Sequence, residues 1–119
     1  MTVGPPAPRP CASCPYRRDV PSGVWAASNY DRLRAYDAPT GQQPPRLFLC
    51  HQNERDSAQA RICAGWAGCH DAANLLALRV ALVLDDITAA AYEATVDYRS
   101  PVPLFDSGAQ AADHGEQQL

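Results

Sequence analysis

The fold class of this chain is decided by residues 71–84, DAANLLALRVALVL. After Asp71 only Asn74 and Arg79 are polar, so a helix here is apolar nearly all round, as helices buried on every side are. Asp71 is a favoured N-cap residue, and an acidic pair at 85–86 ends the run. We predict a central core helix over this stretch, with a homodimer interface as the alternative cover for its outer side.

A second helix is predicted after this one. It begins at Thr88 as the N-cap and ends before Ser100-Pro101, because the residue ahead of a proline disfavours helical geometry. Toward the N-terminus, either Ser22 or Ser28 can cap a helix that runs to about Asp37. Between these helices, RLFLC at residues 46–50 is typical of a buried strand or extended segment. The chain is therefore predicted to be mainly α, a small helix-rich domain with one short extended element.

The composition is that of a globular domain. Hydrophobic residues make up 46% of the 119, and the formal net charge is −3. Residues 1–63 hold eight Arg and five acids, and residues 64–119 hold two Arg and eight acids, an asymmetry too small to indicate nucleic-acid binding. The sequence has no apolar run long enough to span a bilayer. Its opening residues lack the regions of a signal peptide. We expect a cytoplasmic protein without a membrane partner.

Four cysteines form a chelating pattern: Cys11 and Cys14 as a C-x-x-C pair, then Cys50, then Cys63. Disulfides are disfavoured in the cytoplasm, so this spacing indicates metal binding or catalysis. Thiolates are soft ligands that select zinc, copper(I) or iron–sulfur clusters. The alternative is that Cys50 and Cys63 are core cysteines, because cysteine is among the most buried residue types.

The cysteines and the helical patterns divide the chain into three parts. Residues 1–10 are predicted to be a flexible, Pro-rich arm. Residues 11–105 are predicted to be a single metal-binding helical domain, whose irregular N-terminal half is tied to the helices by the metal. Residues 106–119 are predicted to be a polar tail or a short helix.

The fifth cysteine, Cys69, is predicted to lie outside the ligand set. If residues 63–70 are helical, Cys63, Trp66 and His70 share one face. Cys69 is then rotated by roughly 240° from Cys63, at about 100° per residue. If the glycines in this segment break the helix, Cys69 or His70 can replace Cys63.

An iron–sulfur cluster of the 4Fe–4S kind is the favoured cofactor, and zinc is the alternative. Clusters are held by four thiolates whose spacing can be dispersed, and a proline often follows a ligand cysteine, as Pro15 follows Cys14. Structural zinc sites more often use two C-x-x-C knuckles, or one knuckle with a close His or Cys pair.

Five further side chains are candidate contacts of the centre. Arg17 and Arg18 can offset thiolate charge or contact an acidic partner, although a solvated surface is the simpler role. His51 can donate to a cysteine sulfur or replace a cysteine as ligand. Trp25 and Trp66 can shield the site, although core packing alone explains them.

The segments CASCPYRRDVPSGVW at 11–25, CHQ at 50–52 and CAGWA at 63–67 resemble a family of small uncharacterised cysteine-containing proteins from actinobacteria and their phages. The resemblance covers most of residues 10–115 and brings no established activity. It implies an intracellular actinobacterial origin. It also implies that the four cysteines of the pattern above are the ligand set.

A looser similarity links the chain to the WhiB-like iron–sulfur regulators. Those are small actinobacterial proteins with four cysteines and a Gly-Val/Ile-Trp turn, which Gly23-Val24-Trp25 resembles. Their C-x-x-C and C-x5-C share a cysteine, whereas here the Cys11/Cys14 and Cys63/Cys69 pairs lie far apart. Their tail is basic for DNA and this one is acidic, so the similarity is an analogy only.

The sequence thus predicts a metal-centre protein that senses redox state or supports an unidentified protein partner. The competing class is a zinc-stabilised protein-interaction module. A third class is a small metalloenzyme with an open metal position, in which His51, Arg17 or Arg18 lies near the substrate. No carboxylate pair, phosphate loop or nucleophile–base motif supports an enzyme, so no catalytic residue is predicted.

Overall fold

The computed structural model describes residues 2–53 and 57–117 of the chain, and within them the fold is mainly α, as predicted. Residue 1 of the predicted arm, residues 54–56 of the predicted domain and residues 118–119 of the predicted tail lie outside the described residues. The helices are α1 (Ala27–Ala35), α2 (Ala64–Cys69), α3 (Leu76–Val83), α4 (Ala89–Val96) and α5 (Gly108–Glu116), with 3-10 turns η1 (Thr40–Gln42) and η2 (Ala72–Asn74). None of the described helices has the length and apolarity that a membrane crossing needs.

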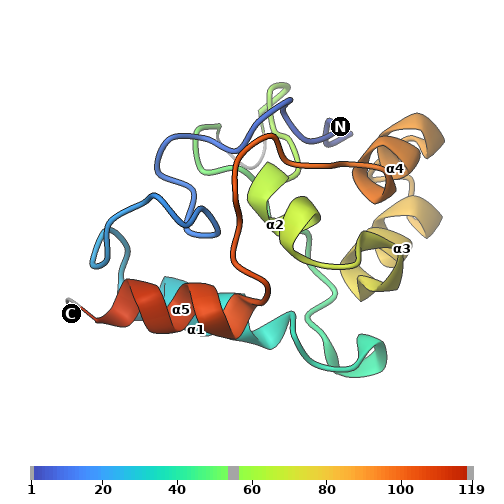
Figure 1. Cartoon of the computed structure of the whole chain (residues 1–119). Helices are drawn as coiled ribbons and strands as arrows, with labels where there is room; N and C mark the ends of the chain where they lie inside the picture. The colour runs from blue at the N-terminus through green and yellow to red at the C-terminus, as the bar shows by residue number, and fades with distance from the viewer. Residues whose placement is uncertain (1, 54–56, 118–119) are drawn as a thin grey trace.

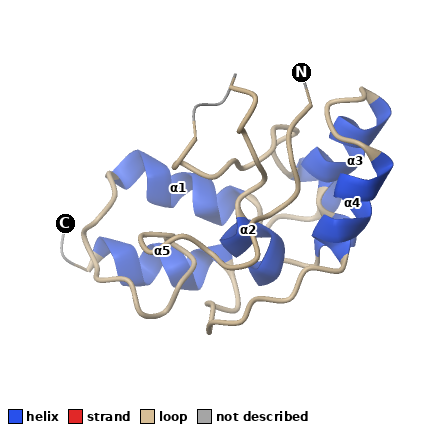
Figure 2. Cartoon of the chain, turned by 90° about the horizontal axis from the view of Figure 1, so that it is seen from above, coloured by secondary structure: helices blue, strands red, loops and turns tan. Residues whose placement is uncertain are grey.

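Two pairs of helices flank the short helix α2. Helices α1 and α5 lie side by side along one edge of the molecule, and α3 and α4 form the other pair (Figure 1). The perpendicular view also places α2 between the two pairs (Figure 2). The short helix is therefore central in space, although it has only six residues.

The predicted core helix is shorter and less enclosed than its sequence indicates. Helix α3 begins at Leu76 rather than at Asp71, because residues 72–74 form a separate 3-10 turn. Its end is open to solvent: Val83 is 79% exposed and Leu84 is 63% exposed. The prediction of a helix buried on every side is wrong, because α3 lies at the edge of the molecule with α4 as its main helical neighbour (Figure 2).

The N-caps of the two other predicted helices differ in outcome. The Thr88 side chain accepts a hydrogen bond from the backbone N–H of Ala91 at 3.0 Å, so the predicted cap of α4 is confirmed. Ala26 is the N-cap residue of α1 and supplies no side-chain hydrogen bond. The predicted caps Ser22 and Ser28 are therefore wrong. Backbone geometry and the packing of the α1 face define this start, without a serine hydroxyl.

Helix α5 packs closely along α1 (Figures 1 and 2). Asp37, just beyond the end of α1, accepts the backbone N–H groups of Gly108 and Ala109, both at 2.8 Å, and so supplements the N-cap of α5, the Ser107 hydroxyl, which accepts the N–H of Gln110. Gly115 faces Tyr30, and a Cβ atom there would lie 2.0 Å from Cε1 of the tyrosine ring. Only glycine allows the two helices to approach this closely.

Candidate metal centre

The C-x-x-C segment forms a tight turn. The backbone N–H of Cys14 donates to the carbonyl oxygen of Cys11 at 3.0 Å, and the N–H of Arg17 donates to that of Cys14 at 3.1 Å. The two thiols are close enough to form a side-chain hydrogen bond. This hydrogen bond, followed by burial, raises the pKa of Cys11 above its ordinary value. The turn therefore presents its two sulfurs as a pair.

A short backbone pairing positions the other two cysteines. The predicted extended segment pairs through an isolated antiparallel bridge between Leu49 and Ile62. Two hydrogen bonds flank that bridge: Cys50 N–H to the carbonyl oxygen of Arg61, and Cys63 N–H to that of Phe48, both at 2.9 Å. Cys50 and Cys63 are therefore held next to the same bridge, although 12 residues separate them in the sequence.

The sulfurs of Cys14 and Cys63 lie 3.9 Å apart. Both residues are buried, with exposed fractions of 1% and 5%. The hydrogen bond with Cys11 lowers the pKa of Cys14, but the contact with Cys63 and burial outweigh it, so the pKa is raised overall. The raised pKa of Cys14 means that a thiolate beside Cys63 in this buried place is unfavourable without a nearby cation.

Gly65 makes room for the Cys14 sulfur. Helix α2 begins directly after Cys63, and Gly65 lies in its first turn. A Cβ atom at position 65 would lie 2.3 Å from Sγ of Cys14 and 2.9 Å from Cβ of Tyr16. Both distances are below any ordinary contact, so the approach of the C-x-x-C turn to α2 requires glycine at this position.

Cys50 completes a series of neighbouring thiols. Burial, together with the nearby Cys11, raises the pKa of Cys50. Cys11, Cys50 and Cys63 line one cavity of about 440 Å³. Cys11 and Cys63 also line a second cavity, of about 70 Å³, together with Cys14. Cys11 and Cys63 thus separate the two cavities, and the four predicted ligands lie in one region of the molecule.

The four thiols do not yet surround one point. As the side chains stand, no group of three or more His, Cys, Asp or Glu residues within 2–53 and 57–117 is arranged to hold a metal ion. All five cysteines are free thiols. For all four to bind one metal, the thiol side chains must rearrange around a common point.

His51 lies against the Cys11 sulfur. Its Nδ1 and Nε2 atoms are 3.7 and 4.0 Å from that sulfur, so the sulfur faces the ring and not one nitrogen. The Nε2 atom also lies 2.9 Å from the Ser13 hydroxyl and 3.0 Å from the Gln52 amide nitrogen. Burial lowers the pKa of His51. This position makes His51 a neighbour of the thiols and an alternative ligand.

The two tryptophans lie at different depths. Trp25 donates its indole N–H to the carbonyl oxygen of Ser13 at 3.0 Å, and its ring meets the His51 ring edge-on at 4.5 Å. It covers the smaller cavity. Trp66 on α2 is fully buried and packs on Tyr36, with ring centroids 5.4 Å apart. Its indole N–H has no hydrogen-bond partner in the described part of the chain. Trp66 is a core residue beneath α2.

Cys69 and His70 belong to a different cavity, of about 350 Å³. Burial, followed by the carboxylates of Asp37 and Asp106, raises the pKa of Cys69 to about 12. Nε2 of His70 lies 3.4 Å from the hydroxyl of Tyr16, and its Nδ1 lies 3.8 Å from Asp37. Cys69 and His70 therefore line a different cavity from the four predicted ligands, although the Cys14 thiol is near enough to act on the pKa of Cys69.

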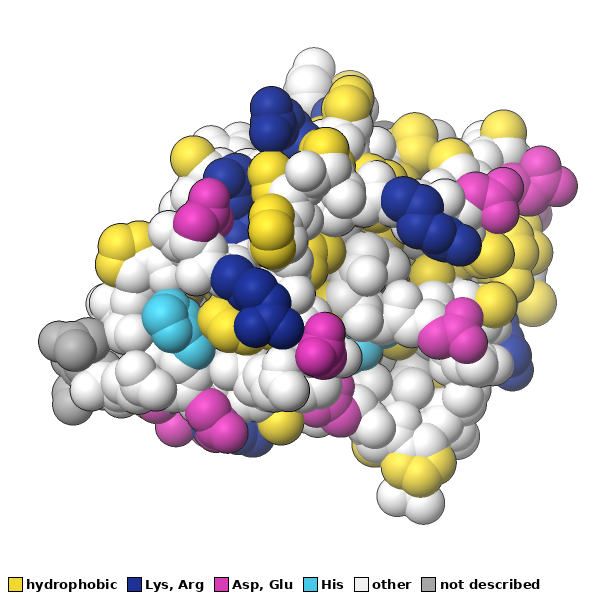
Figure 3. Space-filling model, in the orientation of Figure 1, with side chains coloured by type: hydrophobic (Ala, Val, Ile, Leu, Met, Phe, Trp, Pro, Cys, Tyr) yellow, Lys and Arg dark blue, Asp and Glu magenta, His cyan; other side chains and the backbone are white. Residues whose placement is uncertain are grey.

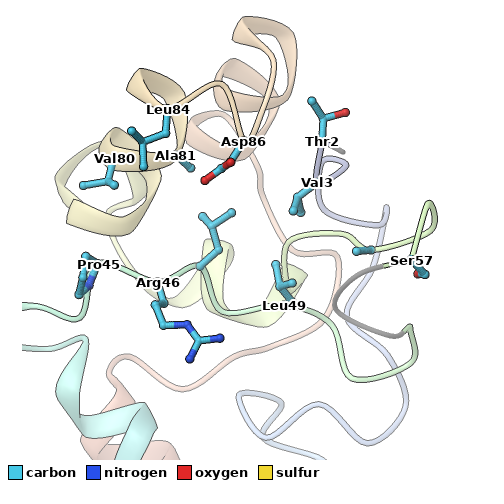
Figure 4. A pocket seen from close by; sticks show the side chains of 12 residues that line it. Thr2, Val3, Pro45, Arg46, Leu49, Ser57, Val80, Ala81, Leu84 and Asp86 are labelled. Atoms are coloured by element: carbon cyan, nitrogen blue, oxygen red, sulfur yellow. The ribbon is translucent and has the colours of Figure 1, made fainter.

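Another large cavity, also of about 440 Å³, carries no cysteine. Figure 4 shows Val3 of the N-terminal arm and Leu49 facing Val80 and Leu84 of the α3 region across it. Elsewhere on the surface, arginines lie among acidic side chains on the face shown in Figure 3. This cavity therefore contributes no thiol to the candidate centre.

The sequence does not predict the roles of two residues of this region. It indicates Gly65 only as one of the glycines that can break a helix, and no motif includes Tyr16. Tyr16 is fully buried, and its hydroxyl lies 3.4 Å from Nε2 of His70, the C-cap residue of α2. The sequence signal for Gly65 is its place directly after a candidate ligand, where glycine permits close approach of another segment.

A family described as a family of unknown function, DUF6283, matches residues 6–119. The chain therefore belongs to this family. No curated protein and no solved structure matches the chain. The predicted resemblance to an uncharacterised family is confirmed at this level, and the family assigns no activity to the cysteines.

Proposed function

We propose that this protein holds a metal centre through Cys11, Cys14, Cys50 and Cys63. The observation that carries the proposal is the 3.9 Å separation of the Cys14 and Cys63 sulfurs. With zinc–sulfur bonds of about 2.3 Å in a tetrahedron, neighbouring ligand sulfurs lie about 3.8 Å apart. This pair is therefore spaced like two ligands of a single tetrahedral ion.

The raised pKa values of Cys11, Cys14 and Cys50 support the proposal. They reflect hydrogen bonds between neighbouring thiols at Cys11 and Cys14, and burial at all three positions. A bound divalent cation removes the penalty for ionising these thiols, because a coordinating thiol loses its proton to the metal. The Gly65 opening and the bridge between Leu49 and Ile62 hold the segments that carry these thiols in register.

The sulfur spacing favours zinc, with a structural role in an interaction module. The ligands come from separate segments, so the ion would link the turn at 11–14 to the bridge and to α2. An iron–sulfur cluster is the second candidate. The smaller cavity has apolar walls that include Leu33, Phe48 and Leu49, and such a shell tunes the potential of a redox centre. A cluster in this place would give the redox-sensing role predicted from the sequence.

A cytoplasmic location and a protein partner are part of the proposal. All five cysteines are free, which suits a compartment that keeps thiols reduced. The exposed Val83 and Leu84 at the end of α3 offer an apolar contact for a partner or for a second copy of the chain. An actinobacterial or phage origin stays a prediction from the sequence resemblance.

Anaerobic purification of the full chain, with metal analysis and a visible spectrum, tests the proposal. One zinc per colourless chain is the expected result. A brown protein with iron, sulfide and absorption that dithionite bleaches would identify the cluster instead. A chain that contains no metal and binds neither zinc nor cobalt(II) when reduced would refute the proposal in both forms.

Single Cys→Ser variants at the four positions should each lose the metal. The matched control is Cys69→Ser, which removes a thiol from the separate cavity and should retain it. Cys50→Ser and His51→Gln together identify the fourth ligand. If His51→Gln abolishes binding while Cys50→Ser does not, the set is Cys11, Cys14, His51 and Cys63.

A further inference from the structure

The guanidinium of Arg17 lies against the backbone of the C-x-x-C turn. Its Nη1 donates to the carbonyl oxygens of Pro10 at 3.1 Å and of Cys11 at 3.4 Å. Its Nε and Nη2 donate to the two carboxylate oxygens of Asp19 at 2.8 and 2.7 Å. One planar group thus joins the first ligand cysteine to the chain beyond the turn.

The two partners of the Arg17–Asp19 pair differ in exposure. The arginine side chain is 16% exposed and the aspartate side chain is 62% exposed. Water screens the exposed carboxylate more strongly than the guanidinium. The guanidinium lies on the cysteine side of the pair, since its Nη1 contacts the carbonyl oxygen of Cys11 and Arg17 lines the same cavity as three of the candidate ligands.

The larger cavity beside the cysteines has the same character. Its charged lining within the described residues consists of Arg9, Arg17 and Arg61. Four thiolates around a divalent ion carry a net charge of about −2. The arginines lie where that charge needs a counter-ion.

We infer that Arg17 is a positioning residue of the centre, which fixes the Cys11 backbone and offsets the negative charge of the thiolates. The inference rests on the proposed function. Two roles are joined in one side chain: the planar fork holds the carbonyl oxygens, and the positive charge stabilises the deprotonated sulfurs. Lysine would keep the charge and lose the fork.

Arg18 provides a matched control in the next position of the chain. Its Nε donates to the carbonyl oxygen of Leu104 at 2.8 Å, and its guanidinium lies 5.0 Å from the centre of the Phe105 ring. Its ion pair with Asp106 spans 3.4 Å, and its side chain is 45% exposed. Arg18 therefore contacts the 104–106 segment and not the cysteine turn.

Titration of the reduced, full-length protein with cobalt(II) tests the inference. Cobalt reports both affinity and the sulfur-to-cobalt charge-transfer band. Arg17→Gln should weaken cobalt binding by about 10- to 100-fold, the usual effect of losing a residue that orients a ligand. Arg18→Gln should stay within about twofold of the wild type.

The charge-transfer band separates the two roles of Arg17. Loss of a nearby positive charge raises the energy of the sulfur electrons, so the band of Arg17→Gln should move to longer wavelength. Arg17→Lys should bind cobalt more weakly than the wild type with the band unmoved. A purely structural arginine would change affinity alone.

Three outcomes decide the inference. If Arg17→Gln equals Arg18→Gln in both cobalt affinity and the position of the charge-transfer band, the assigned role of Arg17 is wrong. The proposed metal centre is not affected by that result. If Arg17→Gln does not fold, Asp19→Asn answers the same question, because it keeps the guanidinium and removes its carboxylate. Its band should move to shorter wavelength, and a shift to longer wavelength contradicts the assigned charge. Failure of the wild type to bind cobalt or zinc, together with the absence of iron after anaerobic purification, refutes the proposed function instead.

Discussion

Replacement of Gly65 by alanine perturbs the contact on which the candidate centre depends. The added Cβ would lie 2.3 Å from Sγ of Cys14 and 2.9 Å from Cβ of Tyr16. Neither neighbour has free space, because Cys14 is 1% exposed and Tyr16 is fully buried. Overpacking of this kind costs about 1–3 kcal/mol. Alanine also gains up to about 1 kcal/mol of helix propensity over glycine.

We expect Gly65→Ala to lower the free energy of unfolding by about 2 kcal/mol, which is the larger overpacking cost less the gain in helix propensity. The clash falls on a ligand sulfur, so metal affinity should fall as well. Each 1.4 kcal/mol of strain carried into the bound state weakens binding about tenfold. Urea denaturation and cobalt titration measure the two effects separately.

Gly68 in the same helix is the matched control. A Cβ there would meet Cδ1 of Leu104 at 2.8 Å, the far end of a side chain that can move, and no cysteine. Gly41 has nothing within 4 Å of an added Cβ and controls for the substitution itself. If Gly65→Ala binds cobalt as tightly as Gly68→Ala, the close approach of Cys14 to α2 has no role in metal binding.

Three other predictions address the surroundings of the site. Cys69→Ala should keep the metal stoichiometry of the wild type, and loss of metal would place Cys69 among the ligands. Asp37→Ala should destabilise the fold by about 1–2 kcal/mol in urea, because it removes two hydrogen bonds to the first backbone N–H groups of α5 and leaves only the Ser107 cap, whereas Asp31→Ala should change stability by less than about 0.5 kcal/mol. Burial lowers the pKa of His70, with Asp37 acting in the opposite direction, so the unfolded chain takes up a proton first as the pH falls below about 6.5. The stability that neutral His70 contributes is therefore complete above that pH and is lost toward the folded-state pKa, with a slope of at most about 1.4 kcal/mol per pH unit. His70→Gln should flatten this slope between pH 7.5 and 5.5, and an unchanged slope would exclude His70 as its source.

Local sequence patterns predicted the helical class and the cap at Thr88, because both depend on neighbours in the chain. They did not predict the extent of α3. Apolar side chains over 71–84 indicate a helix whose surface is buried by neighbouring elements. The extent of that burial depends on how many elements the fold places around the helix. Helix α3 has α4 beside it and solvent at its end, so Val83 and Leu84 stay exposed.

In the candidate site, too, some features follow from neighbours in the chain and others depend on the fold. Spacing and ligand chemistry predict the four cysteines as ligands, and helix geometry sets Cys69 aside; the ligand set stays a prediction, and Cys69 lines a different cavity. The need for glycine at 65 could not be predicted, because it depends on contact with Cys14, far away in the sequence. The different directions of Arg17 and Arg18 likewise follow from the fold, since adjacent arginines look alike in a sequence.

The packing of α5 on α1 sets an order of events during synthesis. Leu33 on the inner face of α1 is fully buried, and Gly108 at the start of α5 lies against its carbonyl group. About 75 residues separate the two positions, which a ribosome takes about 4–15 s to add at about 5–20 residues per second. During that interval α1 lacks the packing of α5. The C-x-x-C turn precedes α1 in the chain, and the bridge and α2 are synthesised within the interval. Chaperones that bind exposed apolar segments therefore have seconds in which to bind this chain. A metal ion that ordered the N-terminal half early would reduce the apolar surface available to them.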